Sequence, residues 1–411
     1  MTSNIVIIGA SHAGVSFADA MRSNGFDGAL TLIDRQAGTP MERPPLSKAF
    51  LLEDQDSQNA AFMLRSADWY VANNITLKMG ADVAAIDPVA KALSLADGTA
   101  ISYDKLVLAT GAVPRMLPSA SGLDNVFMLR QPDDAAALKQ AAQSAKSAII
   151  VGGGYIGLEV AASLRKRGLE VSVVEAADRL LARVASPPVA SFIGDLHHAH
   201  DVSVHTAAGI ASIADNKGVF TGVTLTDGRE LSADMLVVGI GVTPDSQLAQ
   251  MAHIETASND NGAILVDRMM RTSNPDILAI GDVALQRDHA LRIESVHNAQ
   301  DSAARAVAGL LDVPLPIDQA PWFWSDQYDA KLQSAGIVPS GADDLTHVTR
   351  PGKREGGMSV WTYRGSRLLA VEAIRDPAGY MLGKKCLEAE ISPDPDQIGD
   401  PAFDLKALLA H

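Results

Sequence analysis

Uninterrupted apolar runs along the chain alternate with glycine-containing turns and with segments of helical periodicity. The first apolar run, residues 4–8, leads into a turn at Gly9, and a second run ends at Asp34. A continuous apolar run is typical of a parallel strand that is buried on both faces. Between the two runs, apolar residues recur at helical spacing from about His12: Val15, Phe17, Ala18 and Met21. The pattern predicts strand, turn, helix and strand over residues 4–34.

The same order of elements returns in residues 150–175, "IVGGGYIGLEVAASLRKRGLEVSVVE". Each of these units is followed by a further apolar strand that ends in Gly and Pro, within residues 104–115 and 233–245. A chain that alternates strands and helices in this way folds as α/β with a parallel sheet. The two halves therefore indicate two similar Rossmann-like dinucleotide-binding domains.

Residues 272–284 predict another buried strand, which ends at Gly281 and Asp282. The composition changes after residues 315–319, where alternating patterns such as "SVWTYRG" and "LLAVEAIR" replace the glycine turns. Alternation of this kind is typical of strands with one buried face. We therefore expect a C-terminal α+β domain, built from an antiparallel sheet and terminal helices.

A chain of 411 residues is too long for one ordinary core, so two or three domains are expected. No apolar run is long enough to span a bilayer, and we expect no membrane association. The first apolar run has no basic segment before it and reaches its turn by Gly9, so we interpret it as a buried strand and not as a signal peptide. The expected location is cytoplasmic.

Charge and cysteine content narrow the function further. The formal net charge of −15 argues against nucleic-acid binding, which needs a basic surface. Cys386 is the only cysteine, so an intrachain disulfide and a two-cysteine redox centre are both excluded. We expect no metal site.

The glycines of the second unit, Gly152, Gly154 and Gly157, have the spacing of a dinucleotide-binding turn. In such a turn the first glycine allows the tight bend, the second lets a pyrophosphate approach the backbone, and the third lets helix and strand pack closely. The phosphates then lie at the helix N-terminus. Glu175, 18 residues after Gly157, is placed to accept hydrogen bonds from a ribose hydroxyl.

The first unit departs from this pattern in one position. Gly9 and Gly14 are in place, but Ser11 stands where the middle glycine is expected. Serine is small, and its hydroxyl can donate to a phosphate. Asp34, 20 residues after Gly14, ends the second strand. Two dinucleotide sites in one chain suit a resident FAD and a visiting nicotinamide, since hydride can pass from the nicotinamide to the flavin.

Seven motifs follow one another in order: "ERPPLSKAF", "LATGAVPR", "GGGYIGLEVA", "VVEAADRLLAR", "AIGDVA", "RIESVHNAQ" and "FWSDQYDAKLQSAG". With them the chain resembles the putidaredoxin-reductase-like family of FAD-dependent NADH:ferredoxin reductases, which serve bacterial dioxygenases and cytochromes P450. The resemblance implies a glutathione-reductase-like architecture. It also implies FAD and NADH as cofactors, a [2Fe-2S] ferredoxin as partner, and a monomer or homodimer.

The domain boundaries that the resemblance implies make the first domain discontinuous. Residues 1–114 and 242–317 would bind FAD, residues 115–241 would bind NADH, and residues 318–411 would form the C-terminal domain.

The resemblance also implies roles for individual residues. Lys48 would lie beside flavin N5 and pair with Glu159, and these two are the expected catalytic residues. Without the resemblance, Lys48 is interpreted as a surface lysine and Glu159 as part of a solvated helix face. The other residues expected to contact FAD are Gly9, Ser11, His12, Ala13, Gly14, Asp34, Arg35, Arg43, Val83, Thr110, Gly111, Arg130, Asp282, Val296 and Trp324. Those expected to contact NADH are Gly152, Gly154, Tyr155, Ile156, Gly157, Glu159, Glu175, Arg183 and Gly239.

Some of these residues have a simpler interpretation. Trp324 is equally compatible with a place in the core. His12 and His297 are expected to be neighbours of the flavin and not acid–base catalysts, since hydride transfer to flavin requires no such group.

Two departures from the family bear on the chemistry. Met41 stands where the family often has tyrosine, which we interpret as a packing change. Ser11-His12 resembles the turn of NADH peroxidases and coenzyme A disulfide reductases, which need a redox cysteine. Here Ser47 and Lys48 stand in the corresponding region, so we reject that branch.

Three alternatives to ferredoxin reduction stay open at this point: a rubredoxin reductase, an NADH oxidase, and a redox-switch flavoprotein similar to apoptosis-inducing factor. A basic segment offers a surface for an acidic ferredoxin, although a solvated sheet face explains it as well. The segment contains Arg350, Lys353, Arg354, Arg364, Arg367 and Arg375, against Glu355 and Glu372.

Overall fold

The computed structural model describes residues 3–53, 61–258 and 260–409 and divides the chain into two compact units. Unit 1 comprises Met1–Pro45, Asp54–Val113 and Val242–Ile317, and unit 2 comprises Leu46–Glu53, Pro114–Gly241 and Asp318–His411. The chain therefore passes repeatedly from one unit to the other. Within the described residues, no helix is both long and apolar enough to cross a bilayer.

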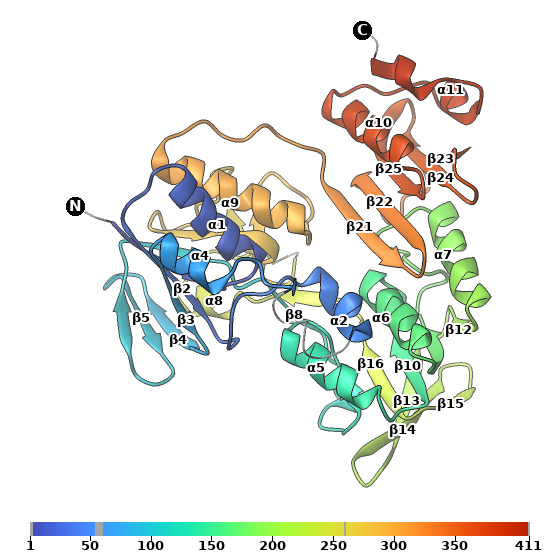
Figure 1. Ribbon diagram of the computed structural model, residues 1–411, viewed down its shortest axis with the longest axis horizontal. Coiled ribbons are helices and arrows are strands. Elements are labelled where there is room, and N and C mark those ends of the chain that lie inside the picture. Colours follow the sequence, from blue (N-terminus) through green and yellow to red (C-terminus); the bar gives the residue numbers. More distant parts are fainter. Residues whose placement is uncertain (1–2, 54–60, 259, 410–411) are drawn as a thin grey trace. The chain divides into compact units, whose positions relative to one another are not determined.

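Unit 1 is built on a five-stranded parallel sheet in the order β19-β7-β1-β2-β3. Its strands are β1 (Asn4–Ile8), β2 (Ala29–Asp34), β3 (Ile75–Met79), β7 (Lys105–Leu108) and β19 (Ile277–Ala279). Helix α1 (His12–Ser23) follows β1 directly and packs against α9 (Val296–Leu311), as Figure 1 shows. The strand–turn–helix–strand order predicted for residues 4–34 is confirmed. The four apolar residues predicted to face the sheet from this helix are all buried.

Smaller elements complete unit 1. A three-stranded antiparallel sheet contains β4 (Val83–Asp87), β5 (Ala92–Leu95) and β6 (Ala100–Ser102), and two further pairs join β8 (Ala112–Pro114) to β17 (Val242–Pro244) and β18 (Ile264–Val266) to β20 (Ala284–Gln286). The short helices are α4 (Ala67–Ala72), α8 (Gln247–Met251) and the 3-10 turn η4 (Gly281–Val283).

Unit 2 repeats the parallel architecture. Its first sheet has the order β12-β11-β10-β16-β9, with β9 (Val126–Phe127), β10 (Ser147–Val151), β11 (Glu170–Val174), β12 (Val202–His205) and β16 (Met235–Val238). Helix α6 (Tyr155–Lys166) lies between β10 and β11 in sequence and corresponds to α1 of unit 1. Accompanying elements are η1 (Pro44–Ser47), α2 (Ala49–Leu52), η3 (Pro118–Ala120), α5 (Pro132–Ala141), α7 (Pro187–Ala199), and the sheet of β13 (Ile210–Asn216), β14 (Val219–Leu225) and β15 (Glu230–Ser232).

The C-terminal part of unit 2 is a five-stranded antiparallel sheet in the order β21-β22-β25-β24-β23. Its strands are β21 (Trp322–Gln327), β22 (Ala330–Gly336), β23 (Leu345–Pro351), β24 (Met358–Arg364) and β25 (Arg367–Ile374), followed by α10 (Pro377–Glu388), α11 (Pro395–Gly399) and η5 (Leu405–Leu409). The predicted antiparallel sheet and terminal helices are confirmed, and with them the α/β fold class.

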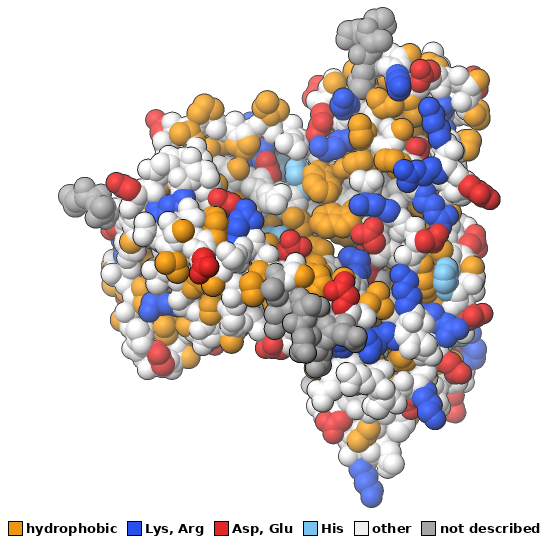
Figure 2. Space-filling view, viewed as in Figure 1, with side chains coloured by type: hydrophobic (Ala, Val, Ile, Leu, Met, Phe, Trp, Pro, Cys, Tyr) orange, Lys and Arg blue, Asp and Glu red, His pale blue; other side chains and the backbone are white. Residues whose placement is uncertain are grey.

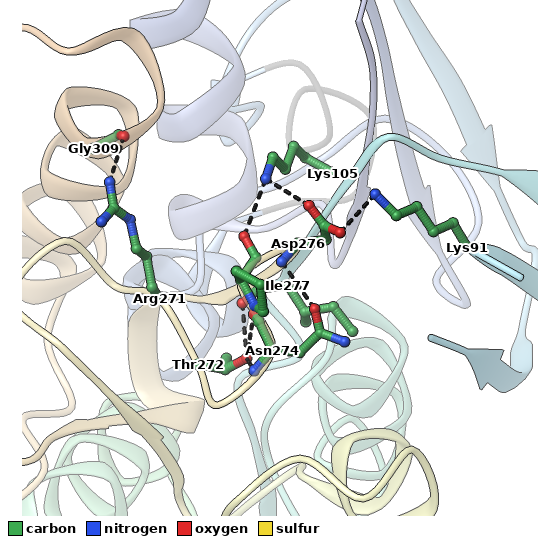
Figure 3. A network of polar contacts seen from close by, with 9 residues as sticks. Lys91, Lys105, Arg271, Thr272, Asn274, Asp276, Ile277 and Gly309 are labelled. Carbon is green, nitrogen blue, oxygen red and sulfur yellow. Dashed lines mark hydrogen bonds and ion pairs between the residues drawn. The ribbon is translucent and has the colours of Figure 1, made fainter. Parts of the chain in front are cut away.

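The strand predicted over residues 272–284 is shorter than expected. Ile277–Ala279 forms β19, and Ala284 already begins β20 after the turn η4. Thr272 and Asn274 form a turn before β19: the Thr272 hydroxyl donates to the Ile277 carbonyl at 2.8 Å, and the Asn274 side chain accepts from the Asp276 amide at 2.9 Å. Figure 3 shows that Asp276 also binds Lys91 and Lys105, each at 2.6 Å. Asp276 thereby ties this turn to β7 and to the turn between β4 and β5.

Candidate functional site

The first glycine turn, in unit 1, has space only for glycine. Gly9 has a φ of +108°, and a Cβ atom there would lie 2.1 Å from the Ala109 carbonyl oxygen. A Cβ at Gly14 would lie 1.9 Å from the carbonyl oxygen of Gly9. Both distances are well below contact, so strand and helix can approach this closely only because both residues are glycine.

Asp34 is fixed at the end of β2 by backbone amides. Its Oδ2 accepts from the Ala10 amide at 2.7 Å and its Oδ1 from the Gln36 amide at 2.8 Å. Each oxygen keeps a further lone pair, since a carboxylate accepts about four hydrogen bonds. The position and remaining acceptor capacity suit a ribose hydroxyl.

Ser11 and Arg43 lie together at the N-terminus of α1. The Ser11 side chain makes no capping bond to the helix, and its Oγ accepts from Arg43 Nε at 3.1 Å. The serine therefore retains its own proton to donate. A hydroxyl donor, a guanidinium and the N-terminus of a 12-residue helix form a fitting environment for a pyrophosphate. The unit 1 turn thus fits FAD.

The remaining FAD candidates of unit 1 lie around the same sheet. Arg35 pairs with Asp245 at 2.9 Å, and the Thr110 hydroxyl donates to the Asp245 carbonyl at 2.6 Å. Val83 is buried at the start of β4, and Val296 is the first residue of α9. His12 and Ala13 begin α1, Gly111 has a φ of +73°, and Asp282 lies in η4. His297 lies in α9.

The second glycine turn, in unit 2, has the same construction. Gly152 has a φ of +112°, and a Cβ there would lie 2.3 Å from the Gly239 carbonyl oxygen. A Cβ at Gly157 would lie 2.2 Å from the carbonyl oxygen of Gly152. Gly154, in contrast, has nothing within 4 Å of a Cβ position. This open space is what the approach of a pyrophosphate to the backbone requires.

Glu175 corresponds to Asp34. Its Oε2 accepts from the Gly153 amide at 2.6 Å and its Oε1 from the Ala177 amide at 2.7 Å. The glutamate is therefore anchored at the glycine turn itself. The unit 2 turn fits a second dinucleotide.

Three further NADH candidates lie near this turn. Tyr155 packs on Phe323 with ring centroids 4.6 Å apart, and burial raises the pKa of its hydroxyl. Ile156 is 48% exposed at the start of α6, which is high for isoleucine and leaves it accessible to a ligand. Arg183 is exposed, with its guanidinium beside Gly241.

Lys48 and Glu159 form the ion pair that the resemblance implies, with Lys48 Nζ 2.8 Å from Glu159 Oε2. Glu159 is 1% exposed, so the interpretation as a solvated helix face is wrong for this residue. Lys48 keeps 19% of its side chain exposed. A buried carboxylate requires such compensation, because removing it from water is costly.

Sequence reasoning missed the two serines that hold this carboxylate. Ser47 donates to Glu159 Oε2, and Ser325 donates to Glu159 Oε1 at 2.6 Å. Both serines are buried and lie within quoted motifs, "PPLSK" and "FWSDQ". The sequence signal that could have identified Ser325 is a polar residue at a position of the strand that faces the core.

Not all FAD candidates lie in one unit. Lys48, Arg130 and Trp324 belong to unit 2, whereas the other residues assigned to FAD belong to unit 1. Trp324 is half-buried, so it does not occupy a fully buried core position. Its ring centroid lies 5.6 Å from that of Trp322. Arg130 is also half-buried, and its backbone amide donates to Asp134 at 2.9 Å.

The predicted basic surface is not a single surface. Arg350 is buried, and it donates to the carbonyl oxygens of Ile398, Asp400, Pro401 and Phe403, so it anchors the C-terminal segment. Glu372 is also buried. The exposed basic residues of the segment are Lys353, Arg354, Arg364 and Arg367. Figure 2 shows Lys and Arg side chains over the part of unit 2 that carries the C-terminal sheet.

Cys386 is buried in α10, and burial raises the pKa of its thiol. A raised pKa disfavours the reactive thiolate. Within the described residues, no group of three or more His, Cys, Asp or Glu could hold a metal ion.

Comparisons with known proteins agree with this geometry. Residues 3–303 match the protein family described as pyridine nucleotide-disulphide oxidoreductase, and residues 322–409 match the family described as Reductase C-terminal. The chain is similar to rhodocoxin reductase of Rhodococcus erythropolis, with 42% identity over 413 residues, covering 99% of this chain and 95% of that protein.

Solved structures show the same likeness. The chain is similar to the ferredoxin reductase for the CYP199A2 system from Rhodopseudomonas palustris, with 38% identity and a TM-score of 0.92 over 99% of this chain and 100% of that one. It is also similar to a chain of the covalent putidaredoxin reductase–putidaredoxin complex, with 35% identity and a TM-score of 0.92 over 99% of this chain and 98% of that one.

Proposed function

The chain belongs to the pyridine nucleotide-disulphide oxidoreductase family, and from this premise we propose that it is an FAD-dependent reductase that passes electrons from NADH to a small [2Fe-2S] ferredoxin. The observation that carries the proposal is the pair of glycine turns, one in each unit, each with a carboxylate anchored beside it. A single-cofactor enzyme would need only one of them. The similarity to the ferredoxin reductase for the CYP199A2 system supports the acceptor.

The residues divide between the two cofactors. The turn at Gly9 and Gly14, with Ser11, Arg43 and Asp34, would hold FAD. The turn at Gly152, Gly154 and Gly157, with Glu175, would hold NADH. Bound FAD would supply an acceptor for hydride and the means to deliver electrons singly to an iron–sulfur centre.

The polar groups of the chain have distinct tasks in this function. Asp34 and Glu175 bind ribose hydroxyls and so orient each dinucleotide along its turn. Lys48 supplies a positive charge that favours the electron-rich, reduced state of the cofactor, as fixed charges do at other sites where negative charge develops. Glu159 keeps that ammonium in place, because it is buried and hydrogen-bonded on both oxygens.

We assign residues 1–114 and 242–317 to FAD binding, residues 115–241 to NADH binding and residues 318–411 to a separate C-terminal α+β domain. The repeated strand–turn–helix unit supports the first two assignments, and the family match that begins at residue 322 supports the third. We also propose a cytoplasmic location, which the single buried cysteine suits. Cell fractionation with an antibody against the chain tests the location.

The test of function is NADH-driven reduction of a purified [2Fe-2S] ferredoxin. The purified protein is expected to show a flavin spectrum and to reduce the ferredoxin in many turnovers at the expense of NADH. Rubredoxin and oxygen serve as competing acceptors in parallel assays. Faster turnover with either of them, or a single slow turnover that leaves a long-lived reduced complex, would contradict ferredoxin as the acceptor.

A further inference from the structure

Three buried polar side chains of unit 2 lead away from Glu159 in a continuous line of hydrogen bonds. Ser325 Oγ lies 2.6 Å from Glu159 Oε1, Gln327 Nε2 lies 3.2 Å from Ser325 Oγ, and His197 Nε2 lies 2.8 Å from Gln327 Oε1. All are at most 1% exposed. They come from three elements: Glu159 from α6, Ser325 and Gln327 from β21, and His197 from α7.

The position of Ser325 and Gln327 on β21 is unusual. They are two residues apart, so both point to the same face of the strand, and that face is buried. An inward face of this kind normally carries apolar side chains. Polar groups are tolerated there only when they are hydrogen-bonded, because an unpaired buried polar group is costly.

The direction of each hydrogen bond follows from the donors and acceptors that these groups possess. Glu159 already accepts from Lys48, so its carboxylate accepts from Ser325 as well. The Ser325 hydroxyl has then used its one proton and must accept from the Gln327 amide nitrogen. This fixes the Gln327 amide oxygen toward His197, whose Nε2 must donate.

His197 ends the line as a neutral ring with its proton on Nε2. Its Nδ1 is buried and has no hydrogen-bond partner within the described part of the chain. Burial lowers the pKa of His197 to about 4, and the nearby His198 and His200 act in the same direction. The ring of Tyr328 lies against it edge-on, with centroids 5.2 Å apart.

We propose that Ser325, Gln327 and His197 form a one-way hydrogen-bond chain that positions the Glu159 carboxylate, and through it the Lys48 ammonium, for flavin reduction by NADH. The three are positioning residues, since they act through Glu159. The proposal rests on the proposed function, because it assigns these three residues a role in the reduction of flavin by NADH. Every bond donates toward Glu159, so the chain reinforces its negative charge.

The first experiment measures flavin bleaching by saturating NADH in a stopped-flow instrument. Ser325→Ala is expected to slow bleaching about tenfold, the loss expected for a hydrogen bond to a charged group. Gln327→Met is expected to slow it about fivefold, since Gln327 bonds the neutral Ser325 and acts on the carboxylate through it. Ser359→Ala is the matched control: Ser359 is a buried serine of the same sheet, and its Oγ accepts from Trp361 Nε1 instead of binding Glu159. This control is expected to keep the wild-type rate.

A double-mutant cycle separates positioning from general structural damage. If Ser325 acts through Glu159, then Ser325→Ala adds little once Glu159→Ala is present, because the two effects are coupled. A full additional loss in that background, or wild-type rates in Ser325→Ala and Gln327→Met, overturns the proposal.

The second experiment needs no turnover. Nitrogen-15 NMR of histidine-labelled protein is expected to show His197 as the Nε2–H tautomer, with no titration above about pH 5. A proton on His197 Nδ1, or titration of His197 near pH 6.5, overturns the proposed direction of the hydrogen bonds even if the enzyme is active. If instead NADH fails to bleach the wild-type flavin, the proposed function fails. The tautomer of His197 still shows whether the hydrogen bonds run toward Glu159.

Discussion

At the scale of single residues, Lys48 and Glu159 carry the most specific prediction. Lys48→Ala and Glu159→Gln are expected to slow flavin reduction by NADH at least about tenfold, a loss of about 1.4 kcal/mol of transition-state stabilisation. The physical reason is that either change removes one charge of a pair whose carboxylate is buried. Stopped-flow bleaching of the flavin measures the rate, and the flavin absorbance of the purified variants measures FAD content.

FAD content is expected to stay at the wild-type level in both variants, because the glycine turn assigned to FAD lies elsewhere in the sequence. Wild-type bleaching rates in both variants would contradict a catalytic role for the pair and would leave Lys48 as a surface charge.

Glu175 is expected to make the enzyme prefer NADH over NADPH. Its carboxylate would repel a 2′-phosphate: two unit charges 4 Å apart at an effective dielectric of 20 interact by about 4 kcal/mol. The residue is partly exposed, so solvent reduces this value, and we expect a preference in kcat/KM of at least about tenfold. Glu175→Gln keeps the shape and is expected to narrow the preference. A wild-type preference for NADPH would refute the assignment.

Residues of the glycine turns could be predicted from sequence because their constraint is local. Gly9, Gly14, Gly152 and Gly157 are fixed by steric contact within a strand–turn–helix unit, and the spacing alone records that contact. Ser47 and Ser325 could not be assigned to Glu159, since they lie 112 and 166 positions away from it in the chain. Such pairs are created by the packing of elements and leave no mark on local periodicity.

At the scale of elements, Asp276 links three segments of unit 1, as described above for Figure 3. Hydrogen bonds from Lys105 and Lys91 lower the pKa of its carboxyl below the usual value. A depressed pKa in the folded state stabilises the fold above the unfolded pKa near 4, and this contribution is lost as the pH falls through the folded pKa.

Asp276→Asn is therefore expected to lower the free energy of unfolding by about 1 kcal/mol at pH 7, and by progressively less as the pH falls through the depressed pKa of the wild-type carboxyl. Urea unfolding at several pH values measures the difference. Lys91→Met and Lys105→Met should each reproduce part of the loss. A difference that does not shrink as the pH is lowered from 7 into the range where the carboxyl becomes protonated would mean that shape, and not charge, explains the effect.

Periodicity predicted most elements because buried parallel strands are continuous apolar runs, and β1, β7, β10 and β16 all are. It failed where side chains bond the backbone locally. The segment predicted as a strand, residues 272–284, begins with the polar stretch "TSNPD", in which Thr272 and Asn274 bond nearby backbone groups and hold a turn until Ile277. Side-chain bonds of this kind compete with strand pairing, and hydropathy does not register them.

At the scale of the whole molecule, the distribution of charge on the C-terminal sheet indicates where a ferredoxin can dock. Small electron-transfer ferredoxins are usually acidic, and this chain carries a net charge of −15, so the two repel at long range. Docking then needs a local basic surface. Because β23, β24 and β25 are antiparallel, their basic residues divide between two ends of the sheet.

Lys353 and Arg354 lie in the turn between β23 and β24, whereas Arg364 and Arg367 flank the turn between β24 and β25. These turns lie at opposite ends of seven-residue β24, about 20 Å apart at the usual rise of a strand. Arg375, which directly follows β25, lies at the same end as Lys353 and pairs with Asp329 at 2.7 Å. Arg364, at the other end, pairs with Asp344 at 2.9 Å. Within the described residues Lys353 and Arg354 form no ion pair, so we expect the dock at their end.

We expect the double variant Lys353→Glu/Arg354→Glu to raise the apparent KM for ferredoxin at least about tenfold at low salt, while NADH-to-ferricyanide turnover stays unchanged. Ferricyanide is small and needs no protein surface, so it separates lost docking from damaged chemistry. The matched control is Arg364→Glu/Arg367→Glu, which makes the same change of charge at the other end of the sheet and should alter the KM much less. The effect of the first variant should also shrink with added salt, because the Debye length falls to about 8 Å at 0.15 M. Equal effects from both variants would indicate a response to net charge alone, and no effect from the first would place the dock on another surface.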